Sequence, residues 1–521
     1  MGRRYHWLLD IELGGQTVRL AETDLEVTSA LGVLRYDAGL LGELDAIARG
    51  DEPTITMFLP AGVDPLRFEH SHGILRLWRE DQALEEASVY AEGVVTDLEY
   101  GATDDPVQCV IAPYTEDAPQ IPDAQAVVVD GETWPITAGE VVVEEHAGMY
   151  YPVIYGYPGE RYGVTTTTGT TYVVPVPLAQ HNATDFNDTL LVIADQPLKA
   201  GTSGNTVGVA NFGSDPFTLT TQSWRYVADL TGRLVTVADF SADHSAQVGN
   251  NASQAEFYAG FSRAGGGGRC SDAYAVIVDV LQRWGGARHI DYQAMTGIEA
   301  LLSRYRVDTW INEPTTAQEW LDSVLLPLLP VRWAQGRAGM YLAPDPYFAT
   351  ALDVRRAIDI GQRDGERRSP VRVNGRALAN EVAVVFWRSR TSGHWGRRIL
   401  TAQSENLSKP WFQTGADERI IAHPLAAASQ ARYGLHRAPE LEVDWTWDAG
   451  TALLVAQDQL ERRAFPIETV AYWLADEVDQ GDVLAVTDTE LGWVERLAVV
   501  SEAPLWVGDG WTATLRLVPA V

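Results

Sequence analysis

The chain has 521 residues, of which 71 are acidic and 39 are basic, and its formal net charge is −32. This acidic balance repels nucleic acid and anionic membranes, so it argues against nucleic-acid binding as the main role. The two cysteines exclude a disulfide framework, and no apolar run approaches the ~20 residues of a membrane-spanning helix. The length exceeds one ordinary core, so we expect several domains.

Residues 1–113 are expected to form the first domain, which is mainly β with one helix. The segment 10–22 predicts a hairpin, because its Gly-Gly pair favours a tight turn between two strands. The segment 40–50 predicts a helix that ends at Gly50. Further strands are predicted at 54–60, 72–81, 87–101 and 107–113.

Residues 114–230 are expected to form an inserted, all-β domain. Proline and glycine become frequent, helix signals disappear, and a threonine-rich tract occupies 163–178. Two more strands are predicted at 187–198 and 207–213.

Residues 231–370 are expected to form a helical α+β domain. The segment 270–286 predicts a helix with Ser271 as its N-cap and Gly285 at its end. Two capping boxes are predicted, one that pairs Thr296 with Glu299 and one that pairs Thr316 with Glu319. The second box begins a predicted helix that ends at Pro327. A hairpin is predicted at 331–344.

Residues 371–521 are expected to return to β structure with two helices. Strands are predicted at 380–389, 441–447 and 466–475, helices at 424–434 and 448–465, and three closing strands within 480–519. The segments 93–113 and 497–519 share a weak pattern of strand, polar turn and returning strand. The predicted fold is therefore multidomain and mainly β with α+β parts. It has two β-barrel-like domains, 1–113 and 371–521, besides the all-β insertion and the helical region, and a barrel leaves no exposed sheet edge.

Several segments carry residue types that occur in chemical sites, and for each of them we favour a structural interpretation. His70 and His72 form an H-x-H pair on a predicted strand, where both rings would share one face, but no third metal ligand lies nearby. Three other segments are interpreted as strand, linker and loop; they are Glu144–Glu145–His146, the glycine-rich 262–271 with Cys270, and the polar 179–189 with Asp185 and Asp188.

The stretch 388–398 is the one candidate basic patch, and we interpret it as an exposed hairpin loop. We therefore assign no catalytic, cofactor-binding or metal-binding residue, and we expect no enzyme activity.

Three segments carry a resemblance to a known family: MYYPVIYGYPG at 149–159, the helix–strand–helix pattern at 430–466, and the closing QGDVLAVTDTELGWVERLAVVSEA at 480–503. Together they resemble the tail or baseplate hub proteins of bacteriophages and gene transfer agents. The resemblance covers 149–521 thinly, and 1–148 match only through the barrel pattern.

The resemblance implies a homotrimer with two barrels per chain, so that six barrels form a pseudo-sixfold ring. This ring would continue the sixfold tail tube and begin the threefold tip. It implies contacts with a distal tail protein ring, the tape-measure protein and a tip-fibre or central-fibre protein, and a location at the virion tail tip after assembly in the bacterial host cytoplasm. DNA would pass without specific binding, and an acidic channel would not hold it. The iron–sulfur feature of the gene transfer agent hub is not carried over, because Cys109 and Cys270 are the chain's only cysteines.

Two alternatives stay open. One is a tail-associated cell-wall or glycan hydrolase, which would use a pair of carboxylates that the 71 acidic residues do not single out. The other is a receptor-binding module in which the 114–230 insertion grips a host surface glycan.

Overall fold

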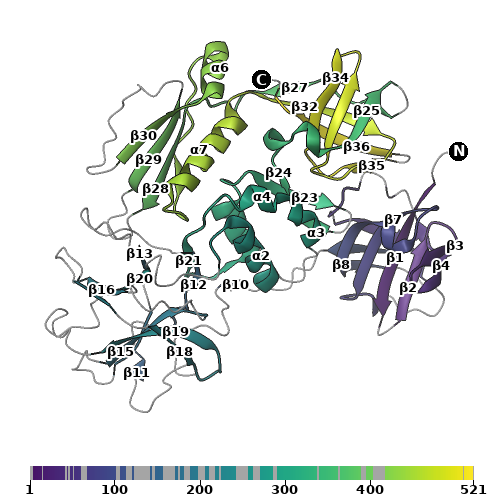
Figure 1. Ribbon diagram of the computed structural model, residues 1–521. Helices are drawn as coiled ribbons and strands as arrows, with labels where there is room; N and C mark the ends of the chain where they lie inside the picture. The colour runs from purple at the N-terminus through teal and green to yellow at the C-terminus, as the bar shows by residue number, and fades with distance from the viewer. Residues whose placement is uncertain are drawn as a thin grey trace.

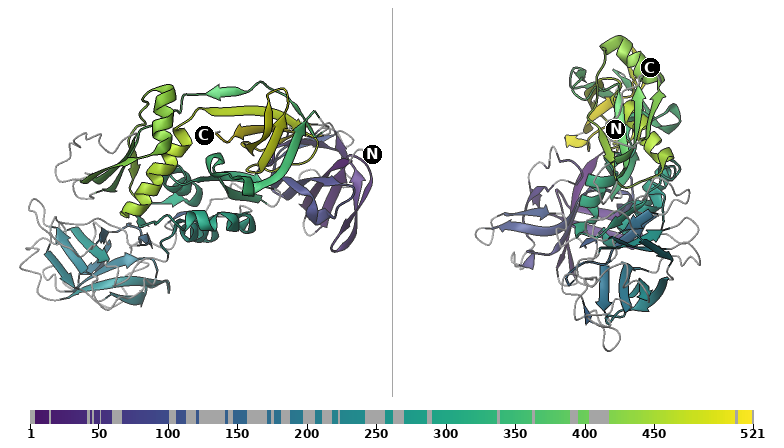
Figure 2. Two further views of the ribbon diagram at one scale, coloured as in Figure 1. Left: turned by 45° about the horizontal axis from the view of Figure 1, so that its top comes forward. Right: turned by 90° about the vertical axis from the view of Figure 1, so that its left-hand side faces the viewer.

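The computed structural model describes residues 4–13, 16–41, 44, 47–50, 52–59, 67–100, 106–112, 120–121, 141–142, 147–156, 171–173, 176–180, 188–196, 206–210, 218–221, 224–241, 256–261, 270–285, 290–336, 339–361, 364–388, 395–402, 417–507 and 510–519. Sheets surround a small helical centre (Figure 1), so the prediction of a mainly β chain is confirmed. The N-terminal and C-terminal sheets lie side by side at one end of the molecule, and the insertion lies at the other (Figure 2).

The N-terminal sheet contains most of the strands expected in 1–113. The hairpin of β1 and β2 is confirmed as an antiparallel pair, in which Leu13 faces Gln16 across the turn. The described strands follow the order β3 (Leu25–Ser29), β4 (Gly32–Ala38), β2 (Gln16–Ala21), β1 (Tyr5–Leu13), β7 (His72–Arg79), β8 (Ser88–Glu99), β9 (Val107–Ala112), β6 (Thr54–Met57) and β5 (Leu40–Leu41).

The helix expected at 40–50 is wrong in its described residues. Leu40 and Leu41 form strand β5 and pair with Met57 and Thr56. Further along the same segment, Ala48 forms an isolated antiparallel bridge. The leucines that suggested a helical face are instead buried in the sheet's own core, so tertiary pairing overrides the local pattern.

One short piece of chain borders both ends of this sheet. β4 pairs with β2, and β5, which follows at once, pairs with β6 at the other end of the strand order. Gly39 lies between them: its N–H donates to the Ala21 carbonyl at 2.9 Å, and its carbonyl accepts from the N–H of Phe58 at 2.7 Å. A Cβ at Gly39 would lie 2.9 Å from both the Leu20 side chain and the Phe58 carbonyl, so this close approach favours glycine.

The C-terminal sheet has a comparable arrangement. The expected closing strands are confirmed as β33, β34 and β36, with the short β35 in addition. The first and last strands of the order, β25 and β26, are consecutive in the chain. The order is β25 (Val354–Ile360), β33 (Val483–Asp488), β34 (Trp493–Val500), β36 (Gly510–Leu517), β32 (Ile467–Leu474) and β26 (Gly365–Arg367), with β27 (Arg372–Asn374) on β32 and β35 (Leu505–Val507) on β36.

In the residues described, no sheet is recorded as closed into a barrel, so the two barrels are not confirmed. Both ends of each sheet nevertheless involve consecutive chain segments. The pairing of β25 with β33 also crosses the boundary expected at residue 370.

The helical centre differs from the prediction mainly at its caps. Asp272 caps α2 (Ala273–Trp284) by accepting from the Ala275 N–H at 2.9 Å, so Ser271 is not the N-cap, whereas the end at Gly285 is confirmed. The remaining described elements are α3 (Tyr292–Met295), α4 (Glu299–Leu302), α5 (Ala317–Trp320), a π-helical turn (Leu321–Leu325), and the antiparallel hairpin β23 (Val331–Gly336) and β24 (Gly339–Pro344), which confirms the hairpin expected at 331–344.

Of the two capping boxes, one is wrong and one is half formed. Thr296 lies inside a continuous helical stretch, and its hydroxyl donates to the Gln293 carbonyl at 2.7 Å. Thr316 does cap α5 by accepting from the Glu319 N–H at 3.1 Å. The Glu319 carboxylate, however, accepts from the Thr315 hydroxyl.

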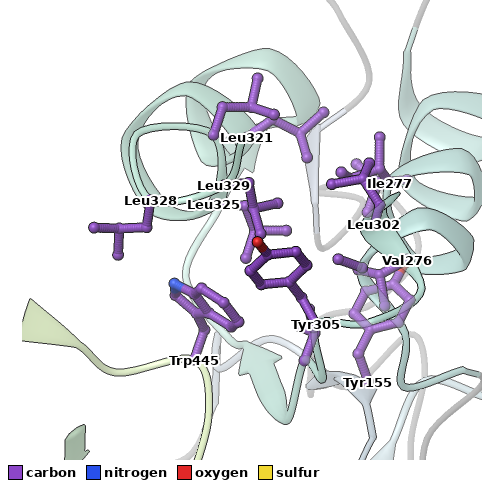
Figure 3. Packing of buried hydrophobic residues seen from close by; sticks show 14 of the residues in the cluster. Tyr155, Val276, Ile277, Leu302, Tyr305, Leu321, Leu325, Leu328, Leu329 and Trp445 are labelled. Atoms are coloured by element: carbon purple, nitrogen blue, oxygen red, sulfur yellow. The ribbon is translucent and has the colours of Figure 1, made fainter. Parts of the chain in front are cut away.

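A buried apolar cluster joins this centre to the next sheet (Figure 3). Val276 and Ile277 of α2 face Tyr305, and Trp445 packs on the other side, near Leu328. Because the cluster draws on segments before and after residue 370, it makes one packed unit of them.

The four-stranded sheet carries two helices. The expected helices are confirmed as α6 (Pro424–Tyr433), followed by Gly434, and α7 (Ala449–Arg463), capped by Asp448. The strand expected at 441–447 is shorter in the structure: it ends at Val443, so Trp445 and Trp447 lie beyond it. The strand order is β30 (Asp417–Ala422), β29 (Trp395–Ala402), β28 (Val382–Arg388) and β31 (Leu441–Val443).

The insertion is all-β in its described residues. Its strands from beyond residue 230, β19 and β20, pair with earlier ones, and β12 (Val153–Tyr155) pairs with β21 (Thr309–Ile311) of the helical centre. The first of two further sheets has the order β11 (Val141–Val142), β14 (Val176–Gln180), β15 (Asp188–Ala194), β19 (Leu234–Ser241) and β18 (Trp224–Ala228). The second has the order β13 (Thr171–Val173), β20 (Glu256–Phe261), β16 (Thr206–Ala210) and β17 (Thr218–Thr221). In addition, β10 (Gln120–Ile121) pairs with β22 (Thr315–Thr316).

Candidate assembly joint between the two sheets

The N-terminal and C-terminal sheets meet through buried aromatic rings. Trp506 and Trp511 of the C-terminal sheet belong to the buried core of the N-terminal sheet. Their ring centroids lie 4.7 Å apart, and both lie about 5 Å from Tyr5. The Trp511 Nε1–H donates to the Tyr90 hydroxyl at 2.8 Å. The two tryptophans of the C-terminal sheet therefore complete the buried core of the N-terminal sheet, whereas the rest of the C-terminal sheet has a core of its own.

A buried ion pair lies beside these rings. Arg49 is 1% exposed at its side chain, and its guanidinium donates to the carboxylates of Glu477 and Asp479. The same guanidinium lies 5.5 Å from the centroid of the Tyr90 ring, and the Ser88 hydroxyl donates to Glu477. We call Arg49, Ser88, Tyr90, Glu477, Asp479, Trp506 and Trp511 the sheet joint.

The electrostatics of the joint follow from this burial. Burial disfavours the charged form of Arg49, but Glu477 and Asp479 outweigh it, so the pKa of the guanidinium is raised. Burial also raises the pKa of the Tyr90 hydroxyl. At neutral pH the joint therefore holds one cation between two anions, with a neutral phenol beside them.

The turn after Asp479 binds the hairpin of the helical centre as well. The Tyr341 hydroxyl donates to the Gln480 carbonyl at 2.6 Å, and the Gln480 side chain accepts from the Gln335 N–H at 2.9 Å. Arg355 of β25 donates to Asp482 at 2.6 Å. This turn therefore touches the N-terminal sheet, the hairpin and β25 at once.

The segment 149–159 that carried part of the resemblance has a structural role in its described residues. Tyr151, Val153 and Tyr155 are fully buried, and the Gly156 N–H donates to the Cys270 carbonyl at 2.7 Å. The segment attaches the insertion to the helical centre.

The candidate sites considered from the sequence are not assembled where they are described. His70 lies before β7 with a φ of 62°, so it does not share a strand face with His72. His72 lies instead between Glu12 and Glu92, at 3.8 and 3.2 Å. Among the described residues no group of three or more histidine, cysteine, aspartate or glutamate side chains could hold a metal ion.

Other candidates fall largely outside the described residues. These include Glu144, Glu145, His146, Asp185, residues 262–269 and residues 389–394. Asp188 begins strand β15, neither cysteine forms a disulfide among the described residues, and Cys109 is buried. Of the helices that the structure describes, none combines the length and hydropathy that a membrane crossing requires.

Sequence reasoning missed the sheet joint. The acidic run 476–482 and the Trp pair at 506 and 511 were visible, but nothing in the sequence pairs them with Arg49 or Tyr90. A buried arginine beside Gly50 has no local signature.

No protein-family model matches the chain, and no curated protein matches it. Solved structures do. A tail protein from Neisseria meningitidis MC58 has a TM-score of 0.36 and 8% identity, over 98% of this chain and 96% of that chain. The 43 kDa tail protein of prophage MuSo2 from Shewanella oneidensis has a TM-score of 0.35 and 8% identity, over 98% of both chains. A chain in the virion of the native gene transfer agent particle has a TM-score of 0.38 and 10% identity, over 70% of this chain and 88% of that chain.

These neighbours are tail or virion proteins, which is the class that the sequence resemblance indicated. With TM-scores below 0.5, their likeness does not assign a function. The function proposed below rests on the residues of this chain.

Proposed function

We propose that this protein is a structural component of a bacteriophage or gene transfer agent tail, and that it forms the hub at the tail tip. The observation that carries the proposal is the sheet joint, in which one chain fixes two sheets side by side. A hub that presents two equivalent units per chain needs a firm connection between them, and the buried Arg49 ion pairs together with the Trp511–Tyr90 hydrogen bond support one.

We further propose that the two sheets act as barrel-like hub domains. The support is that the hairpin of β3 and β4 lies at one end of the N-terminal sheet while β5, which directly follows β4 in the chain, lies at the other end, and that β25 and β26 lie at opposite ends of the C-terminal sheet. The segments that suggested a sequence repeat also contain comparable antiparallel pairs, β8 with β9 and β34 with β36. Bringing the ends of a sheet together removes edges on which other chains could pair.

In this proposal three chains place six sheets around a channel for the tape-measure protein and then DNA. The ring would join the sixfold tube, through a distal tail protein ring, to a threefold tip with its fibre protein. The assembly would take place in the host cytoplasm. The net charge of −32 per chain suits a channel that repels DNA in transit.

The proposed role is not enzymatic. The hydrolase alternative is tested by clearing of purified cell wall, and the glycan-binding alternative by a glycan array probed with the full chain. Activity in either assay would add a function that the joint does not supply.

Light scattering of the purified protein across a range of salt tests the hub. A particle of about three times the chain mass of 57.1 kDa, with a central pore in electron micrographs, is expected. A protein that stays monomeric even when mixed with its distal tail ring would contradict the proposal.

A further inference from the structure

Three arginine side chains gather near Asp345 and Tyr347 where the hairpin, α7 and the C-terminal sheet meet. Arg462 of α7 lies 3.5 Å from Asp345, which follows β24, and both side chains are 13% exposed. Arg516 of β36 donates to the Tyr347 hydroxyl at 2.8 Å and lies over its ring at 4.5 Å. Burial lowers the pKa of Arg332 of β23, and the nearby charges of Asp345 and Arg516 act on it in opposite directions.

The guanidinium groups of Arg332 and Arg462 bind neutral acceptors. Arg332 donates to the carbonyls of Ser501 and Val500 at 3.0 and 2.9 Å. Arg462 donates to the carbonyls of Pro327 and Leu329. Backbone carbonyls satisfy hydrogen bonds but do not cancel charge. The carboxylates that interact with these arginines are Asp345, 3.5 Å from Arg462, and Asp458, which also lies within electrostatic range of Arg462.

The cluster also has donors to spare. The Nε–H groups of Arg332 and Arg516 are buried, and neither has a hydrogen-bond acceptor among the residues that the structure describes. The Arg462 Nε is also buried and makes no hydrogen bond, but it lies 3.5 Å from the Asp345 carboxylate. The Tyr347 hydroxyl accepts from Arg516, which leaves its own hydrogen for an acceptor. Burial raises the pKa of Tyr347, so this hydroxyl keeps its proton at neutral pH.

We propose that Arg332, Arg462, Arg516 and Tyr347 bind a small inorganic oxyanion of the phosphate or sulfate class. Guanidinium groups match the oxygens of such anions, and partial burial strengthens charge-assisted hydrogen bonds. Because the chain as a whole carries a charge of −32, three arginines gathered at one place are a local exception whose positive charge an anion would balance. The inference does not depend on the proposed hub function.

Calorimetric titration of the full chain with inorganic phosphate, at ionic strength held constant with sodium chloride, tests the proposal. We expect saturable binding at one site per chain. R516Q should weaken phosphate affinity by about tenfold or more, because it removes a charge-assisted donor. D345N removes the competing carboxylate while keeping an acceptor, so it should tighten the affinity several-fold. R376Q, at an exposed arginine outside the cluster, is the control and should change nothing.

The opposite signs of R516Q and D345N separate ligand binding from a merely structural role. A structural cluster would lose stability in both variants and would show no phosphate heat. Absence of saturable binding to the wild type would overturn the proposal, and so would equal affinities in R516Q and R376Q. If circular dichroism shows that R516Q does not fold, the D345N variant alone tests the site. A phosphate affinity of D345N that is no higher than that of the wild type would then refute the proposal.

Discussion

Replacing Arg49 with methionine should open the sheet joint. Methionine keeps much of the apolar stem but leaves Glu477 and Asp479, which are 11% and 12% exposed at their side chains, as adjacent carboxylates without their cation. Solvent screens such groups weakly, and removing one partner of a buried pair typically costs about 3–5 kcal/mol. The lost contact with the Tyr90 ring adds about 0.5–2 kcal/mol more.

Hydrogen exchange at the Trp506 amide measures this local opening, since that N–H donates across the joint to the Ile47 carbonyl at 3.2 Å. A loss of 3–5 kcal/mol corresponds to an increase in exchange rate of about two to four orders of magnitude. The triple variant R49M/E477Q/D479N removes all three charges and should recover most of the protection. An exchange rate in R49M within about tenfold of the wild type, with no recovery in the triple variant, would refute the reasoning.

Three further predictions concern other parts of the chain. Burial is the main cause that raises the pKa of Asp458 from 3.8 to about 6, so the folded state binds this proton more tightly than the unfolded state and stability falls as pH rises through that window. D458N should abolish this fall in stability, so the free energy of unfolding of the variant should exceed that of the wild type by about 3 kcal/mol at pH 7 but not below pH 4. Denaturant unfolding at both pH values measures this difference. G156A should destabilise the folded protein far more than G232A. Both glycines have a positive φ, at 62° and 86°, but a Cβ at Gly156 would overlap the Val307 carbonyl, whereas nothing lies within 4 Å of a Cβ at Gly232. Equal melting temperatures for the two variants would contradict this prediction. Burial raises the pKa of Cys109 to about 12, so a thiol reagent at neutral pH should modify Cys109 only after unfolding in urea, and labelling of Cys109 in the native protein, read by peptide mass spectrometry, would be the contrary result.

Elements whose signals lie within their own segment could be predicted from the sequence. Gly434 and Asp448 fix the boundaries of α6 and α7 because caps act over a few residues. The same locality explains the error at Thr296. Asp291, five residues earlier, caps the helical stretch by accepting from the Ala294 N–H at 2.9 Å, and Thr296 falls inside it.

Features that depend on distant partners could not be predicted. Leu40, Leu44 and Ile47 fit one face of a helix, yet the described residues are buried against the N-terminal sheet. His70 and His72 alternate in sequence, but positive φ at His70 ends the alternation before the strand begins. Alternation and periodicity show that a side chain is buried, and they do not show which segment covers it.

The sheet joint also sets the timing of folding during synthesis. Arg49 and Asp479 lie 430 residues apart, and Trp506 and Trp511, which complete the core of the N-terminal sheet, are translated later still. At about 5–20 residues per second, a ribosome needs roughly 20–90 s to pass from one partner to the other. During that interval the emerging N-terminal strands expose the apolar surface that the two tryptophans later cover. A nascent chain therefore keeps this surface uncovered until Trp511 has emerged, and products truncated before Trp506 cannot complete the joint.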